Sequence, residues 1–273
     1  MTTERNGAAP RVDTHAHIYH DGMPLAADAW HRPEGEARLD TYLACLDRAG
    51  VARAVLAAIS LFGPNNDYAL AATAAHPRLR TTVIVDPDTD IGMLRGMAAA
   101  GAVGVRLQWR STPAPPDLAS PRWRRFLGRV ADLGWHVQLH DNGRRLTPAI
   151  DAIEQCGAPL VIDHFGRPDV AKGIDCPGFQ AVLRAVARGN CWVKMSADFR
   201  VGPDAMIRDL TRVLLDHAGP ERLLWGSDWP FAVYEGQVTY DQATARFDSL
   251  VPDAGIRDRI HRTANQFYFG DDP

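Results

Sequence analysis

The sequence has few cysteines, no long apolar run and no strong excess of either charge. Its four cysteines stand far apart and form no C-x-x-C pair, which argues against a disulfide scaffold and against a thiolate zinc site. No apolar stretch approaches the roughly 20 residues of a membrane-spanning helix. With 30 basic and 33 acidic residues the formal net charge is -3, so no overall field favours nucleic acid or an anionic membrane. These absences favour a cytoplasmic protein with a small-molecule partner.

The order of local patterns predicts the fold. Short apolar runs alternate with longer amphipathic stretches, which indicates parallel strands joined by right-handed helical crossovers. We predict a single (β/α)8 barrel over residues 11–273, preceded by a flexible segment, residues 1–10. The expected strands cover residues 12–17, 54–59, 81–85, 104–108, 136–140, 160–164, 192–196 and 223–228. The expected helices cover residues 39–49, 67–75, 91–100, 123–133, 148–155, 179–187, 205–217 and 240–250.

The first expected strand ends in two histidines, His15 and His17, separated by one small residue. Side chains alternate along a strand, so both imidazoles lie on one face, about 7 Å apart, and can share a metal ion. Taken alone, such a pair is more often a half-exposed strand with two solvated histidines. Further residues of ligand, acid/base or anion-binding type stand at later strand ends, where a barrel carries its active site. These residues are Arg106, His140, His164 and Asp228.

Three longer motifs end the fifth, sixth and eighth expected strands. They are Trp-His-Val-Gln-Leu-His at 135–140, Val-Ile-Asp-His-Phe-Gly-Arg-Pro-Asp at 161–169, and Leu-Trp-Gly-Ser-Asp-Trp-Pro at 224–230. With the His-x-His pair they resemble the amidohydrolase superfamily, and within it the branch of 2-pyrone-4,6-dicarboxylate lactonases, 4-sulfomuconolactone hydrolases and related lactone enzymes. The resemblance runs from about Arg11 to Phe269. It implies a barrel enzyme that binds one or two divalent metals.

The resemblance also implies a ligand set, with His164 acting on the substrate or relaying a proton. The implied metal ligands are His15, His17, His140 and Asp228. Arg106 occupies the fourth-strand position where binuclear members carry a bridging Lys or Glu, and a guanidinium has no lone pair for a metal. One metal is therefore expected, Zn(II) first and Mn(II) second. The resembling pyrone dicarboxylate lactonases work without metal and carry tyrosine at the position of His140. The histidine in this sequence restores the full ligand set for one metal and argues against metal independence, although metal-free operation stays open.

The expected reaction is the opening of a lactone ring by water. A bound metal lowers the pKa of its water from near 16 to roughly 7. Asp228 would take the proton and pass it to the leaving oxygen, while His164 stabilises the developing oxyanion. The alternatives are a metal-dependent decarboxylase or a lactone isomerase on the same scaffold, which share these residues. A non-catalytic binding barrel is the alternative outside enzymes.

Arginines near the strand ends indicate an anionic substrate, because a guanidinium binds a carboxylate or sulfonate through two parallel hydrogen bonds. Arg106 and Arg200 match positions that hold substrate carboxylates in the resembling lactonases, and Arg110 approximately replaces a third. Trp30 and Trp229 are expected at the substrate. A small acidic substrate in aromatic or sugar acid catabolism is therefore the predicted partner, and a homo-oligomer stays open.

Four aromatic side chains are candidates to cover the barrel mouth: Trp30, Phe62, Trp109 and Trp229. Two further expectations concern the sixth-strand motif. Asp163 precedes His164, so alternation predicts that Asp163 faces the helix layer and is structural. An ion pair between Arg167 and Asp169 is expected to fix the following loop.

Overall fold

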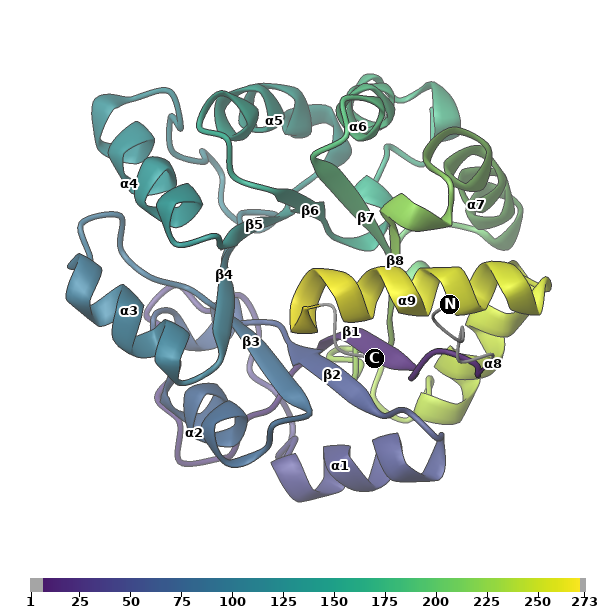
Figure 1. Ribbon diagram of the computed structural model, residues 1–273, viewed down its shortest axis with the longest axis horizontal. Coiled ribbons are helices and arrows are strands. Elements are labelled where there is room, and N and C mark those ends of the chain that lie inside the picture. The colour runs from purple at the N-terminus through teal and green to yellow at the C-terminus, as the bar shows by residue number, and fades with distance from the viewer. Residues whose placement is uncertain (1–6, 271–273) are drawn as a thin grey trace, which may run out of the picture.

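The structure is a computed structural model that describes residues 7–270, so the predicted flexible segment, residues 1–10, lies largely outside the described residues. Eight parallel strands form one sheet in the order β1 to β8. Backbone hydrogen bonds of 2.8 Å join its two edges, from the Asp228 amide to the His15 carbonyl and from the His17 amide to the Trp229 carbonyl. The sheet thus curls into the predicted (β/α)8 barrel with helices around it (Figure 1).

The bounds of the elements agree with the predicted ranges to within a few residues. The strands are β1 (Val12–Ala16), β2 (Arg53–Leu56), β3 (Leu79–Val83), β4 (Ala102–Gln108), β5 (His136–His140), β6 (Leu160–Ile162), β7 (Cys191–Ser196) and β8 (Leu223–Gly226). The helices between and after them are α1 (Leu39–Arg48), α2 (Asp67–Ala75), α3 (Ile91–Ala99), α4 (Pro121–Asp132), α5 (Leu146–Gln155), α6 (Pro177–Ala187), α7 (Asp204–Ala218) and α8 (Tyr240–Leu250). Within the described residues, no helix is long and apolar enough to cross a membrane.

A further helix, α9 (Ala254–Phe269), follows α8 with no strand between them, and strand-helix alternation does not predict it. The Asp253 side chain caps its first turn by accepting from the Ile256 amide at 3.0 Å. On α9, Tyr268 packs with Val12 and other apolar residues at the bottom of the barrel interior. Figure 1 shows α9 crossing the barrel end, and so α9 closes the end opposite to the strand C-termini.

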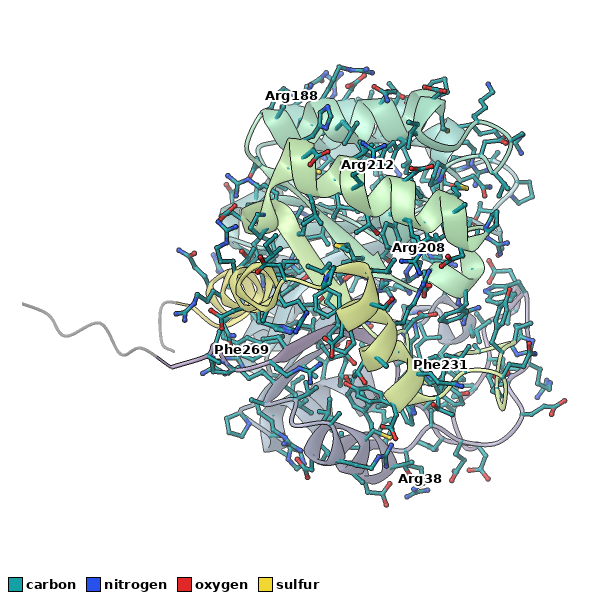
Figure 2. All side chains as sticks on the ribbon, turned by 90° about the vertical axis from the view of Figure 1, so that its right-hand side faces the viewer. Arg38, Arg188, Arg208, Arg212, Phe231 and Phe269 are labelled. Atoms are coloured by element: carbon teal, nitrogen blue, oxygen red, sulfur yellow. The ribbon has the colours of Figure 1, made fainter. Side chains whose placement is uncertain are left out.

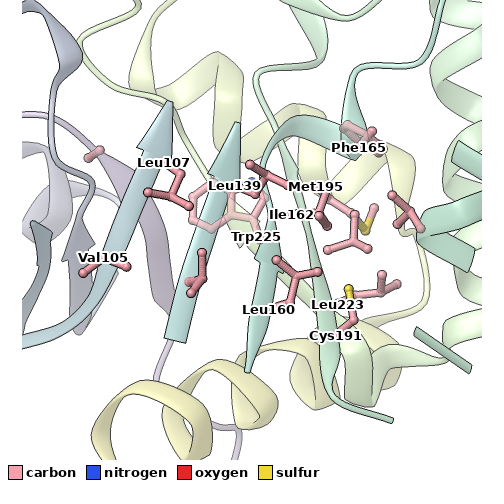
Figure 3. Close-up of a cluster of buried hydrophobic side chains, with 14 of the residues drawn as sticks. Val105, Leu107, Leu139, Leu160, Ile162, Phe165, Cys191, Met195, Leu223 and Trp225 are labelled. Carbon is pink, nitrogen blue, oxygen red and sulfur yellow. The ribbon is translucent and has the colours of Figure 1, made fainter. Parts of the chain in front are cut away.

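The strands carry different side chains on their two faces. On β4 to β8 the side chains that face the helices are apolar and bury against them, each burial contributing roughly 1.5–3 kcal/mol. This set includes Val105, Leu107, Leu139, Leu160, Ile162, Met195, Leu223 and Trp225 (Figure 3). The alternate positions face the barrel interior and carry polar groups that contact one another across strands. These polar residues are Arg106, Gln138, His140, Asp163, Lys194 and Ser196.

The two ends of the barrel are chemically different. In the side view of Figure 2, Phe269 at the end of α9 and Phe231 in the loop after β8 lie towards opposite ends of the molecule. The apolar cluster that contains Val12 and Tyr268 lies at the end of Phe269, and the polar interior residues lie toward the end of Phe231. A glycine on β8 makes room there, because a Cβ on Gly226 would lie 2.5 Å from the His15 Cβ.

Candidate active site

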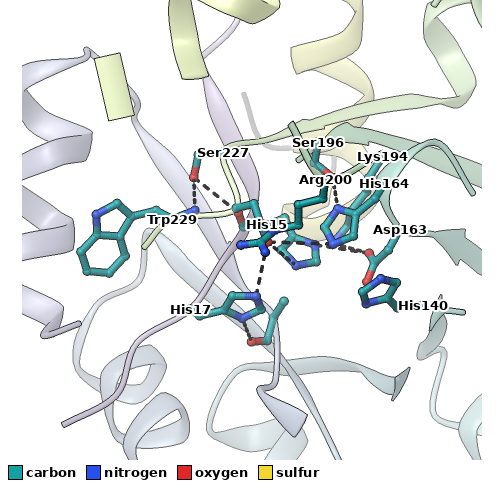
Figure 4. A network of polar contacts seen from close by, with 12 residues as sticks. His15, His17, His140, Asp163, His164, Lys194, Ser196, Arg200, Ser227 and Trp229 are labelled. Carbon is teal, nitrogen blue, oxygen red and sulfur yellow. Dashed lines mark hydrogen bonds and ion pairs between the residues drawn. The ribbon is translucent and has the colours of Figure 1, made fainter. Parts of the chain in front are cut away.

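A cavity of about 220 Å³ opens at the C-terminal ends of the strands, where (β/α)8 enzymes carry their active sites. Most predicted site residues line it: His17, Trp30, Arg106, Arg110, His140, His164, Arg200 and Asp228. His15 is fully buried beside this lining, with its ring centroid 4.7 Å from that of His164. Trp229 is outside the lining, because its ring stacks on Tyr42 with centroids 5.0 Å apart. Figure 4 shows the Trp229 ring directed away from the histidines.

Three of the predicted ligands meet where β1 joins β8. The Nε2 atoms of His15 and His17 each lie 3.6 Å from Asp228 Oδ1 (Figure 4). One ligand atom from each of the three residues lies within 4.8 Å of the others, a spacing that suits one shared cation. Asp228 has a φ of 66°, so it has left the strand conformation and turns its carboxylate back into the cavity. We call His15, His17 and Asp228 the acceptor side of the cavity.

The second ring nitrogen of each of these histidines lies against an oxygen atom, a carbonyl for His17 and a carboxylate for His15. His17 Nδ1 donates to the Ala57 carbonyl at 2.7 Å. His15 Nδ1 lies 3.3 Å from Asp163 Oδ1, and a carboxylate can only accept. With the ring proton on Nδ1, each Nε2 directs a lone pair toward Asp228. His15 Nε2 is buried and has no hydrogen-bond partner among residues 7–270, as expected of an atom that would bind a metal.

The amide of Gln138 does not disturb this assignment. Its nitrogen lies 3.5 Å from His15 Nδ1, at the limit of a hydrogen bond, whereas it donates to Asp163 Oδ2 at 3.0 Å. A second candidate cluster joins His15, Asp163 and His164 within 4.8 Å. It suits a metal less well, because Asp163 is already neutralised by positively charged neighbours. His140, the fourth ligand implied by the resemblance, belongs to neither candidate cluster of the described residues.

Arg106 and His140 lie on neighbouring strands on the other side of the cavity. The Arg106 guanidinium donates Nε to Asp163 Oδ2 at 3.1 Å and Nη1 to the Ala58 carbonyl at 2.6 Å. Its Nη2 lies 3.3 Å from His140 Nδ1. Burial lowers the pKa of His140 well below its usual value, and nearby His164 and Arg106 add to this, so the imidazole is neutral. We call Arg106 and His140 the donor side.

The prediction that Asp163 faces the helix layer is wrong. Leu160 and Ile162 face the helices, so the next inward position after Val161 is Asp163 rather than His164. His164 has a φ of 52° and no longer follows strand alternation, which is why it also reaches the cavity. Burial alone would raise the pKa of Asp163, but its positive neighbours Arg106 and Lys194 hold it well below the usual value.

The predicted ion pair between Arg167 and Asp169 is also wrong: no such pair lies within 4.0 Å in the described chain. Arg167 instead lines the cavity and donates to the Arg200 carbonyl at 2.9 Å. Burial, with the charges of Arg110 and Arg200, lowers the pKa of Arg167 to about 10. The guanidinium stays charged at neutral pH, and four arginines therefore line this one cavity. The sequence signal for Arg167 was present, since it lies within the sixth-strand motif.

The titratable groups at the cavity floor have well-defined charge states. Burial lowers the pKa of His164 to about 3, so its ring is neutral at physiological pH. Its Nδ1 lies 2.8 Å from the Ser196 hydroxyl. Burial alone would raise the pKa of Asp228, but the charge of Arg200, which donates Nε to Oδ2 at 2.6 Å, holds it well below the usual range. Asp228 Oδ1 therefore presents negative charge to the Nε2 atoms of His15 and His17, each 3.6 Å away.

A buried lysine of β7, Lys194, lies next to Asp163. Lys194 Nζ donates to the Thr14 carbonyl at 2.6 Å and lies 3.8 Å from Asp163 Oδ1. Burial lowers the pKa of Lys194 to about 8. Neither Lys194 nor Gln138 was among the predicted site residues. Strand alternation could have found both, because Lys194 stands two positions before Ser196 and Gln138 two before His140.

Among the four aromatic candidates for a cover, Trp30 alone is in the cavity lining. Its side chain stays 42% exposed, so it forms a rim. Trp109 packs edge-on against Trp123, with ring centroids 5.7 Å apart, and Phe62 is buried against Tyr19. Val233, another exposed apolar residue, shares the rim with Trp30.

Comparison with known proteins identifies the class. The amidohydrolase family model matches residues 12–269, and the chain belongs to this family. Members of the family typically bind a divalent metal, for which the acceptor side offers ligands. The predicted family and the predicted barrel are both confirmed.

Individual relatives narrow the class. The chain is 30% identical over 272 residues to the 2-pyrone-4,6-dicarboxylate hydrolase of Comamonas testosteroni, covering 92% of this chain and 87% of the relative. It is 28% identical over 229 residues to the 4-sulfomuconolactone hydrolase of Hydrogenophaga intermedia, covering 81% and 75%. The crystal structure of a probable 2-pyrone-4,6-dicarboxylic acid hydrolase from Acinetobacter baumannii superimposes with a TM-score of 0.90 at 30% identity, covering 94% of this chain and 98% of that one. These relatives are lactone hydrolases, and hydrolysis of a lactone ester bond is the activity that fits the chain best.

Proposed function

We propose that the protein opens an anionic lactone by metal-assisted hydrolysis. The proposal rests on one observation. Three convergent metal-ligand side chains lie at one side of a single cavity, and four arginines line that cavity. The cavity volume of about 220 Å³ is small beside the 300–1,000 Å³ of pockets for drug-sized ligands, so a single substituted ring is the expected substrate.

His15, His17 and Asp228 would hold the metal. Two imidazoles and a carboxylate suit Zn(II), with Mn(II) as the second choice. When bound, the metal supplies Lewis-acid activation of water and of the lactone carbonyl. Asp163 fixes the His15 tautomer and the Ala57 carbonyl fixes that of His17, so both lone pairs are held in place before the ion arrives.

The protein side chains then move protons and stabilise charge. A water oxygen bonds to the lactone carbonyl carbon, and the bond from that carbon to the ring oxygen breaks. Asp228 takes the water proton and returns it to the departing ring oxygen, so that the product is an open hydroxy acid or its keto form. His164, neutral and bonded through Nδ1 to Ser196, places Nε2 3.9 Å from Asp228 Oδ1, near the reacting oxygens.

The arginines select the substrate class. Arg110, Arg167 and Arg200 are charged and line the cavity, so an acidic substituent gains two-pronged hydrogen bonds from at least one guanidinium. The relatives act on a pyrone dicarboxylate and a sulfonated muconolactone, and both names describe ring esters that carry acidic groups. A carboxylated or sulfonated lactone is therefore the proposed substrate.

The test is turnover of 2-pyrone-4,6-dicarboxylate and 4-sulfomuconolactone, with the uncharged parent 2-pyrone as control. Product mass separates the three reactions: hydrolysis adds one water, isomerisation leaves the mass unchanged, and decarboxylation removes carbon dioxide. We expect a product one water heavier from an acidic lactone and negligible turnover of 2-pyrone. Loss of carbon dioxide or an unchanged mass would replace the lactonase proposal with the corresponding alternative.

The metal requirement is tested separately. Elemental analysis of protein purified without chelator is expected to show about one zinc or manganese per chain. Activity is expected to disappear after chelation and to return with Zn(II) or Mn(II). Full activity in metal-free protein would refute the metal part of the proposal and leave the lactonase part in place.

A further inference from the structure

We infer that His140 is a hydrogen-bond donor to an anionic oxygen of the substrate, and not a metal ligand. The substrate part of this inference rests on the proposed function. The part that concerns the imidazole itself rests on the geometry around Arg106 and is tested without turnover.

The first step is the tautomer of His140. A guanidinium has five N–H donors and no acceptor. The contact of 3.3 Å between Arg106 Nη2 and His140 Nδ1 is therefore a hydrogen bond in which Nδ1 accepts. An accepting Nδ1 carries no proton, so the one proton of the imidazole must be on Nε2. A protonated Nε2 has no lone pair for a metal.

The second step is that Arg106 is fixed in place. Its Nε is bonded to Asp163 and its Nη1 to the Ala58 carbonyl, and the side chain is 4% exposed. Asp163 is held in turn by the Gln138 amide at 3.0 Å. A rotation of Arg106 away from His140 would break both of its other bonds and leave a buried carboxylate unpaired. The tautomer of His140 is therefore built into the fold.

The third step is the direction of the donor. His140 Nε2 is buried and has no hydrogen-bond partner among residues 7–270, yet the residue lines the cavity. An unpaired buried N–H is unfavourable, so a ligand that offers an acceptor is favoured there. Arg106 also withdraws electron density through Nδ1, which strengthens the N–H as a donor. Arg110 and Arg167 line the same cavity, so the acceptor that fits is a carboxylate or sulfonate oxygen, whereas a cation is repelled.

The acceptor side gives a control within the same molecule. His15 and His17 have their Nδ1 atoms against oxygen atoms, and with the ring proton on Nδ1 their Nε2 atoms offer lone pairs. His140 has its Nδ1 against a donor, and its Nε2 is protonated. The three imidazoles thus fall into two chemical kinds, although the sequence presents all three as equivalent strand-end histidines.

Nitrogen NMR of protein labelled with nitrogen-15 histidine tests the tautomer, with the His140 signals assigned by their loss in His140→Gln. At neutral pH we expect a pyrrole-type Nε2 and a pyridine-type Nδ1 for His140, and the reverse for His15 and His17 in metal-free protein. Addition of Zn(II) should shift the Nε2 signals of His15 and His17 and leave the His140 pattern unchanged. A pyridine-type Nε2 for His140, or a zinc-induced shift of it, would overturn the inference.

Binding of an anion is tested in the same spectra with isophthalate, a planar dicarboxylate that has no ester to hydrolyse. The proton on His140 Nε2 should move downfield with isophthalate and stay in place with the neutral diamide of the same ring. A response to neither probe, or to both equally, would contradict anion binding at this nitrogen. These results hold or fail whether or not any lactone is turned over.

Two variants of His140 distinguish a hydrogen-bond donor from a metal ligand. His140→Gln keeps an N–H near the position of Nε2, whereas His140→Met has similar bulk and no donor. We expect both to retain the metal content of the wild type, and His17→Gln to lose it. With an acidic lactone, His140→Met should raise KM by roughly tenfold to a hundredfold and His140→Gln by less, since bonds to charged groups are the strong ones. Loss of metal from both His140 variants would show that His140 is a ligand.

Discussion

The two sides of the cavity use the same side chain for opposite purposes. On the acceptor side, two imidazoles have a carboxylate or a carbonyl behind them and present lone pairs to Asp228. On the donor side, the imidazole of His140 has a guanidinium behind it and presents an N–H to the cavity. All three rings lie at strand ends of one barrel. The group that contacts Nδ1 therefore decides whether Nε2 donates a hydrogen bond or offers a lone pair, because a neutral ring has only one proton to place.

One buried carboxylate contacts residues on both sides of the cavity. Asp163 lies between the two sides: its Oδ1 faces His15 Nδ1 and its Oδ2 accepts from Arg106. A single buried carboxylate thus orients His15 directly and His140 through Arg106.

Removing the charge of the acceptor side should have the largest effect. Asp228→Asn keeps the shape of the side chain but cannot take a proton from water, so kcat on an acidic lactone should fall by about a thousandfold or more. Steady-state kinetics measures this fall, and unfolding curves should show a folded protein. Asp216→Asn, an exposed site on α7, is the control and should keep wild-type kcat. A fall of less than about tenfold would exclude Asp228 as the proton acceptor.

Removing the Arg106 guanidinium from the donor side should mainly lower the free energy of unfolding. Arg106→Met leaves Asp163 buried with one fewer cation, and breaking a buried ion pair in this way costs about 3–5 kcal/mol. Urea unfolding of both proteins gives the difference. The exposed pair of Arg212 and Asp216 supplies the control, since Arg212→Met should change the free energy of unfolding by less than about 1 kcal/mol. Equal losses in the two variants would mean that burial does not set the cost.

The other buried histidine of β5, His136, lies outside the cavity lining and shows the effect of burial on an imidazole. Burial lowers the pKa of His136 to about 3, against 6.5 in the unfolded chain. The unfolded state thus binds more protons between these values, so the stability from this group is complete above pH 6.5 and is lost as the pH falls toward 3. Between pH 7 and pH 5, His136→Met should reduce the acid-induced loss of unfolding free energy by about 2 kcal/mol. Parallel curves of stability against pH for the two proteins would contradict this.

The smallest expected effect concerns a single arginine of the cavity wall. Arg167→Gln removes one positive charge that faces the cavity, and KM for an acidic lactone should rise by roughly tenfold, with kcat little changed. Added salt should narrow the difference, because the lost interaction is electrostatic. Arg144→Gln, at an exposed position outside the cavity lining, should behave as wild type. An unchanged KM would place the substrate anion on Arg110 and Arg200 alone.

Much of this site followed from the sequence, because the relevant signals are local. Alternation along β1 places His15 and His17 on one face, and parallel strands bring their C-terminal ends together at one mouth. His140, His164 and Asp228 could therefore be assigned to one site before any contact was known. The arginines followed in the same way, apart from Arg167, whose left-handed backbone at a φ of 41° turns it into the cavity.

The amino-acid sequence was enough to predict the barrel and the end of it at which the candidate site lies, since hydrophobic period and strand ends are properties of neighbouring residues. Only the tertiary structure decided that Asp163 faces inward, that α9 closes the far end, and which nitrogen of each histidine is protonated. The physical reason is that a tautomer depends on one atom contributed by another strand. Ala57, Asp163 and Arg106 supply that atom for His17, His15 and His140, and the two residues of each pair are 34 to 148 residues apart along the chain.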